Sequence, residues 1–185
     1  RVSRTGIEEI EPVNATEPVP LTDFLAIHIG KFDEGNAESA GETKRVVDER
    51  GRVFEREVQD TLLADRRLDE VKFMIRAQDL GGLELDFVVR LGHSYGIGSL
   101  KSGNLRGRES HAVEEIASES RYFGPYVKRF LVVTKILSDG TKKLCNANTV
   151  IPIQLLSFAE KNHLSDEDRQ KLVDTIVEAM QRRRR

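Results

Sequence analysis

The sequence predicts a mixed α/β fold, in which helices flank a central mixed sheet of about four to five strands. Two observations support this prediction. Segments that alternate between apolar and polar residues lie between segments whose apolar residues recur at helical spacing. The composition also suits a soluble chain with a core, because 38% of the 185 residues are hydrophobic and 32% are charged. The predicted order is helix, three strands, helix, strand (αβββαβ), followed by a C-terminal helix.

The N-terminal part lacks a clear period. Residues 1–20 contain three of the five prolines and predict an extended arm. The segment 21–32 is compatible with either a short helix or a strand. We therefore assign residues 1–44 to an arm and linker, 45–150 to the α/β core, and 151–185 to a C-terminal helical extension with a basic tail.

The core begins with a helical pattern over residues 46–63. Three strands are predicted next, at 71–77, 83–91 and 94–101. In the second strand the alternation predicts one apolar face, formed by Leu83, Leu85, Phe87, Val89 and Leu91.

The second half of the chain predicts a helix over 110–123 and a strand over 129–137. The strand is almost continuously apolar, which is typical of burial on both faces. Residues 149–162 mix strand and helix signals. A final helix begins at Ser165, where an S-x-x-D pattern predicts an N-terminal cap.

Two charged residues stand out in the apolar strands. Asp86 lies on the second strand and Lys101 ends the third. A carboxylate can hold Mg²⁺ or Mn²⁺, and a nearby lysine can orient water or stabilise charge that develops on phosphorus. The alternative remains open that Asp86 pairs with a basic residue and that Lys101 is a solvated strand end.

The αβββαβ order with these two residues resembles the PD-(D/E)XK nuclease superfamily, which has the restriction-endonuclease-like fold. The resemblance rests on Glu55 in GRVFEREV, Asp86 in LELDF and Lys101 in GIGSLKSG, and covers roughly residues 45–136. The G-x-x-F-E opening is similar to that of nuclease domains of CRISPR ancillary effectors, which act on nucleic acid after a cyclic oligonucleotide binds elsewhere.

The resemblance implies that Asp86 is the central metal ligand, that Glu55 completes an acidic cluster and that Lys101 positions the attacking water. The cofactor would be Mg²⁺ or Mn²⁺. Ser99 departs from the family pattern, because the family has a carboxylate two residues before the lysine.

A subgroup of restriction enzymes has S-x-K at this place and takes the missing carboxylate from the following helix. Glu114 and Glu115 follow Lys101 by thirteen and fourteen residues. We favour Glu115 as the replacement. An exposed helix face is the alternative for both.

The loop after Lys101 contains Arg106 and Arg108, which we expect to contact phosphates of DNA or RNA. A solvated loop is the alternative for both arginines. The net charge of −2 does not by itself indicate a nucleic-acid partner.

Several classes of protein are excluded or disfavoured. No apolar run is long enough for a membrane span, and no signal-peptide pattern opens the chain. The single cysteine, Cys145, cannot form an internal disulfide, and the four histidines lack zinc-site spacing, so an intracellular (cytoplasmic) location is expected. The chain begins at Arg1 without Met, which suggests a fragment or a trimmed chain. Any activating ligand is expected to bind a regulatory domain outside this chain.

The sequence therefore predicts a metal-dependent nuclease that hydrolyses phosphodiester bonds of DNA or RNA. The alternative is a nuclease-fold domain without catalysis that binds nucleic acid or dimerises. Formation of a homodimer is compatible with either function.

Overall fold

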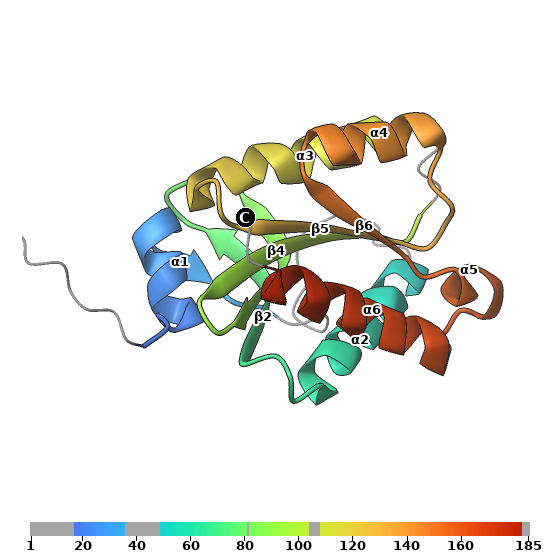
Figure 1. The fold of residues 1–185 in the computed structure, drawn as a ribbon, viewed down its shortest axis with the longest axis horizontal. Coiled ribbons are helices and arrows are strands. Elements are labelled where there is room, and N and C mark those ends of the chain that lie inside the picture. The colour runs from blue at the N-terminus through green and yellow to red at the C-terminus, as the bar shows by residue number, and fades with distance from the viewer. Residues whose placement is uncertain (1–16, 36–48, 81, 104–107, 183–185) are drawn as a thin grey trace, which may run out of the picture.

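A six-stranded mixed sheet forms the centre of the molecule (Figure 1). The structure is a computed structural model that describes residues 17–35, 49–80, 82–103 and 108–182. The strands lie in the order of the sequence. They are β1 (Phe32–Asp33), β2 (Glu70–Ala77), β3 (Glu84–Leu91), β4 (Ser94–Lys101), β5 (Lys128–Val133) and β6 (Val150–Gln154). The mixed α/β fold is confirmed, but the sheet has six strands rather than four to five.

The two unpredicted strands lie at the edges of the sheet. β1 has two residues, too few to show an alternating period, and β6 lies in the segment with mixed signals. β1 to β4 pair antiparallel, and β4, β5 and β6 pair parallel. Parallel neighbours need a crossover connection. Helices supply both crossovers, α3 (Glu109–Glu119) between β4 and β5 and α4 (Asp139–Ala147) between β5 and β6.

Helix α4 was not predicted, and the strand predicted over 129–137 is too long. β5 ends at Val133, and the Oγ atom of Ser138 accepts the backbone N–H of Thr141 at 3.2 Å to begin α4. The 110–123 prediction combines α3 with a 3-10 helix, η2 (Ser120–Phe123). The ambiguous segment 21–32 forms α1 (Leu21–Ile29) and then enters β1.

Helices cover both faces of the sheet (Figure 1). One cluster of buried residues joins α1, α3 and α4 to one face. The other joins the remaining helices to the opposite face, namely α2 (Glu49–Ala64), α5 (Ser157–Lys161) and α6 (Asp166–Gln181). Apolar residues from both sides of residue 150 contribute to the second cluster, whereas the described members of the first cluster end at Val150.

Strand β5 is buried on both faces, as its apolar run predicts. Leu131 and Val133 belong to the cluster under α3, whereas Phe130 and Val132 belong to the cluster under α2 and α6.

Strand β3 departs from its predicted single apolar face. Leu83 and Leu85 pack under α1 and α3, whereas Phe87 and Val89 pack under α2 and α6. The change of face coincides with Met74 of β2, whose φ of 53° interrupts the extended backbone. The strands remain paired on either side of this point, Phe73 with Phe87 and Ile75 with Leu85.

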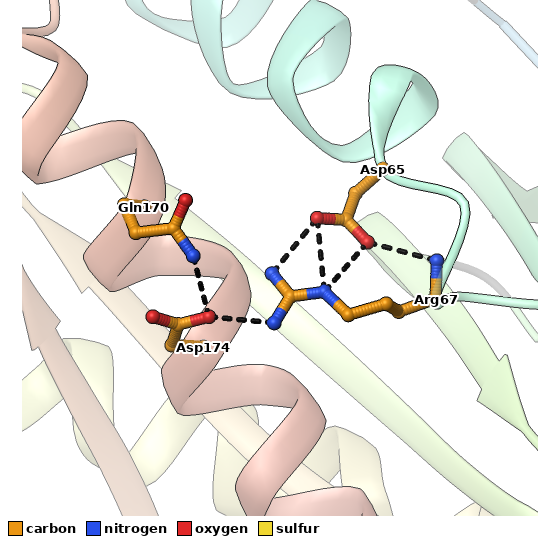
Figure 2. Close-up of polar contacts among 4 residues, drawn as sticks. All are labelled: Asp65, Arg67, Gln170 and Asp174. Atoms are coloured by element: carbon orange, nitrogen blue, oxygen red, sulfur yellow. Dashed lines mark hydrogen bonds and ion pairs between the residues drawn. The ribbon is translucent and has the colours of Figure 1, made fainter.

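Polar contacts join the helices under the sheet. Arg67, in the turn after α2, donates to Asp65 at 3.0 Å and to Asp174 of α6 at 2.7 Å, and Gln170 also donates to Asp174 (Figure 2). The predicted cap of α6 is confirmed, because Ser165 Oγ accepts the backbone N–H of Asp168 at 3.2 Å. Among the described residues, no helix combines the length and the apolar character that crossing a membrane requires.

Candidate nuclease site

The candidate site lies where β3 and β4 separate. Their last ladder pair at this end is Phe87 with Gly98. Beyond it, Asp86 Oδ2 accepts the backbone N–H of Leu100 at 2.6 Å and the hydroxyl of Ser99 at 3.1 Å. The carboxylate therefore takes the place of a ladder acceptor and is fixed between the two strand ends.

Lys101 lies on the same face of β4 as Ser99, because side chains two residues apart in a strand share a face. This face packs under α3. Lys101 Nζ forms an ion pair with Glu115 Oε2 at 3.0 Å, whereas Glu114 is exposed. The structure thus brings together Lys101 and the glutamate that the sequence favoured over its neighbour.

Glu55 approaches from α2, in the opposite helical layer. Burial raises the pKa of Glu55, and the charge of Asp86 raises it further. The charge of Lys101 also acts on this carboxyl. Charged residues from both helical layers therefore influence one another at this end of the sheet.

Glu119 of α3 also belongs to this cluster, and the sequence analysis did not include it. Burial raises the pKa of Glu119 to about 8, with further contributions from the charges of Glu115 and Asp86. Its position one helical turn after Glu115 is the signal that would have identified it, because residues four apart share a helix face.

The electrostatics of the cluster favour an added positive charge. Burial raises the pKa of Asp86, despite its hydrogen bonds from Leu100 and Ser99. Burial alone would lower the pKa of Lys101, but the charges of Asp86 and Glu115 raise it on balance. One ammonium group thus faces several carboxyl groups that have a raised affinity for protons, a pattern that is frequent at functional sites.

The donor set fits a hard cation in its chemistry, because all the candidate ligands are carboxylate oxygens. In the part of the chain that the structure describes, no three His, Cys, Asp or Glu side chains are grouped as a metal site. Glu115 contacts Lys101 instead, and Asp86 contacts the backbone of β4. Lys101 therefore engages one carboxylate oxygen of Glu115 in this arrangement.

The predicted phosphate contacts are only partly described. Arg108 is exposed and immediately precedes α3, at the same end of the sheet as Lys101. Arg106 lies outside the described residues.

Comparisons with known proteins identify similar folds. No family model and no curated protein matches the chain. The solved structure of Can2 from Sulfobacillus thermosulfidooxidans in complex with cyclic tetra-adenylate is similar, with a TM-score of 0.54 and 17% identity, over 74% of this chain. Protein VC1899 from Vibrio cholerae aligns with a TM-score of 0.47 and 12% identity, over 71% of this chain. This chain spans 38% and 33% of those two chains. The Can2 likeness supports the α/β fold.

Proposed function

We propose that this chain is a metal-dependent nuclease domain of the PD-(D/E)XK type. The observation that supports the proposal is the convergence of Asp86, Lys101 and Glu115 at the point where β3 separates from β4. Asp86 is fixed by a backbone N–H, and Lys101 is fixed by the glutamate that replaces the missing carboxylate of an S-x-K motif.

Each residue has a proposed role. Asp86 and Glu115 would hold Mg²⁺ or Mn²⁺, and Glu55 and Glu119 would supply further carboxylates. A bound divalent ion polarises the phosphodiester and lowers the pKa of a bound water. Lys101 orients the attacking water and stabilises negative charge on the phosphate. The exposed Arg108 contacts a neighbouring phosphate of the DNA or RNA strand.

Regulation is proposed to come from outside this chain. The Can2 structure contains cyclic tetra-adenylate, and this chain spans 38% of that protein. Together with the sequence resemblance to CRISPR ancillary nucleases, this supports a regulatory domain that binds a cyclic oligonucleotide and controls the nuclease domain.

The adjacent glutamates of α3 provide a matched test. Glu115→Gln removes the ion pair with Lys101 and one proposed metal ligand, whereas Glu114→Gln changes an exposed side chain. We expect Glu115→Gln to lower the rate of Mn²⁺-dependent cleavage of labelled single- and double-stranded DNA and RNA by at least about 100-fold, the scale of losing one preorganised charged group. Glu114→Gln should retain the wild-type rate. Equal rates for the two variants would contradict the assignment of Glu115.

The second candidate function is a nuclease-fold domain that binds nucleic acid without cleaving it. Ser99 occupies the usual ligand position, and Lys101 engages Glu115, an arrangement that also suits a site without metal. Nucleic-acid binding without cleavage and without any effect of Mn²⁺ on melting would favour this function.

A further inference from the structure

A second pocket lies at the opposite end of β4. Its volume is about 640 Å³, and Ser94 and Tyr95 at the start of the strand line it. Tyr95 precedes Lys101 by six residues, which corresponds to about 20 Å along a strand. The pocket is therefore separate from the candidate nuclease site.

Aromatic rings form the wall of this pocket. The rings of Phe24 and Tyr95 are stacked, with centroids 3.9 Å apart and planes 4° apart, and Phe123 lies 5.7 Å from Phe24. Tyr126, at the rim, is 81% exposed. The stacked rings cover one another's faces, and Phe24 and Phe123 are buried, so they form the apolar lining of the pocket. The exposed ring of Tyr126 is the surface on which a planar ligand can stack.

Basic side chains surround the aromatic wall. They are His28, His93, Lys128 and Arg182, and no acidic residue occurs among the described residues that line the pocket. Lys128 Nζ donates to the backbone carbonyl of Arg182 at 3.3 Å, which joins the start of β5 to the end of α6. Arg182 also contacts Glu178 at 3.3 Å, but this pair is exposed, and exposed pairs contribute little. The guanidinium group is therefore available to an anionic ligand.

We propose that this pocket binds a nucleotide unit, with the base stacked on Tyr126 against the apolar lining and the phosphate at the basic rim. A purely apolar ligand would leave the cationic rim unused, whereas a nucleotide matches both surfaces. The volume lies within the range of about 300–1,000 Å³ that is usual for small-molecule sites. The unit is either a free nucleotide or one base of a single strand. The inference does not depend on the proposed nuclease activity.

Two tyrosines provide the test. Tyr126→Ala removes the exposed ring at the rim, whereas Tyr122→Ala changes an exposed tyrosine that does not line the pocket. Arg182→Gln removes the rim guanidinium. Binding of a fluorescein-labelled single-stranded oligonucleotide is measured by anisotropy in EDTA, with every variant in an Asp86→Ala background to prevent cleavage. AMP serves as the competitor.

We expect Tyr126→Ala and Arg182→Gln each to weaken binding of the oligonucleotide at least fivefold. For the tyrosine, this is the lower end of the about 1–3 kcal/mol that one stacked base contributes. Tyr122→Ala should leave binding unchanged. Competition by AMP would identify a free nucleotide as sufficient, and its failure would identify a strand as the ligand. Equal binding by all variants, or no binding of either probe, would overturn the proposal. It would also be overturned if Tyr126→Ala only dissociated a dimer, which would indicate a protein interface.

Discussion

At the scale of single residues, the backbone around Asp86 decides where its carboxylate lies. Met74 of β2 has a φ of 53°, and both β2 and β3 change the face that they bury at this point. Non-glycine residues seldom adopt this conformation, and such strain is found at functional sites. We infer that the left-handed residue turns β3 so that Asp86 reaches the N–H of Leu100.

Substitutions at Met74 test this role. β-Branched side chains tolerate positive φ least, so Met74→Val should lower the free energy of unfolding by about 1 kcal/mol or more. It should also lower the cleavage rate, because Asp86 loses its position. Met74→Gly adopts positive φ freely and serves as the control. Urea denaturation and the cleavage assay measure the two effects, and a Val variant as stable and active as the Gly variant would contradict the inference.

Glu119 predicts a pH dependence of stability. Its folded pKa of about 8 lies above the ordinary value of 4.5, so the folded state binds the proton more tightly. The stability that this proton provides is present below pH 4.5 and is lost as the pH rises toward 8. Four charged groups act on Glu119, namely Glu115, Asp86, Lys101 and Glu84.

The measurement is the melting temperature in EDTA across this pH range. The wild-type value should fall between pH 5 and pH 8, and Glu119→Gln should reduce this fall. The raised pKa values of Glu55 and Asp86 act in the same direction and leave a residual slope. An unchanged slope in Glu119→Gln would contradict the assignment.

The residues of the site were predictable only in part. Asp86 and Lys101 were proposed from their places on adjacent predicted strands, and Glu115 from the resemblance to restriction enzymes with an S-x-K motif. Glu119 was missed because the sequence does not show that a helical glutamate is buried, although its spacing of four from Glu115 places the two on one helix face. Met74 was missed because a methionine inside an alternating segment gives no signal of positive φ.

At the scale of elements, the glycines of β4 allow large rings to pack beneath the site. A Cβ atom on Gly98 would overlap the ring of Phe87, and one on Gly96 would lie 2.6 Å from the ring of Phe130. The two phenylalanine rings are stacked, with centroids 6.4 Å apart. Small residues in β4 therefore permit the close packing that supports Ser99 and Lys101.

Gly98→Ala should destabilise the protein. Overpacking of this kind costs about 1–3 kcal/mol, because the ring of Phe87 must leave its position. Gly103→Ala is the matched control, since nothing lies within 4 Å of an added Cβ there. Thermal or urea unfolding measures both variants, and equal stability would show that the core accommodates the extra methyl group.

The elements themselves were largely predictable. The helix α2 and the strands β2 to β5 have strong periods, and their positions agree with the sequence analysis to within a few residues except at the C-terminal end of β5. Helix α4 was missed because its buried face contains only Thr141 and Cys145. β1 was missed because its pairing with β2 depends on tertiary contacts rather than on its own two residues.

At the scale of the whole molecule, the two proposed sites lie at opposite ends of one strand of the sheet, β4. The proposed nuclease site lies at the end of β4 that contains Lys101, and the proposed nucleotide pocket lies at the end that contains Tyr95. The fold likeness to Can2 indicates the architecture of the sheet and its helices. A shared fold does not establish function, because the chemistry of each proposed site depends on its own side chains. The two sites therefore need separate tests.

Metal binding should stabilise the whole fold. A ligand present at 100 times its dissociation constant stabilises the native state by about 2.7 kcal/mol. We therefore expect Mn²⁺ to raise the melting temperature of the wild type but not that of Asp86→Asn. No shift in the wild type would favour the domain without catalysis.

The most direct test of the nuclease proposal is cleavage of labelled single- and double-stranded DNA and RNA by the wild type and Asp86→Ala. Each protein is assayed in Mn²⁺, in Mg²⁺ and in EDTA. We predict cleavage of at least one substrate by the wild type in a divalent metal, none in EDTA, and none by Asp86→Ala in any condition. Cleavage by Asp86→Ala at the wild-type rate would contradict the assignment of the site, and cleavage in EDTA would contradict its dependence on metal.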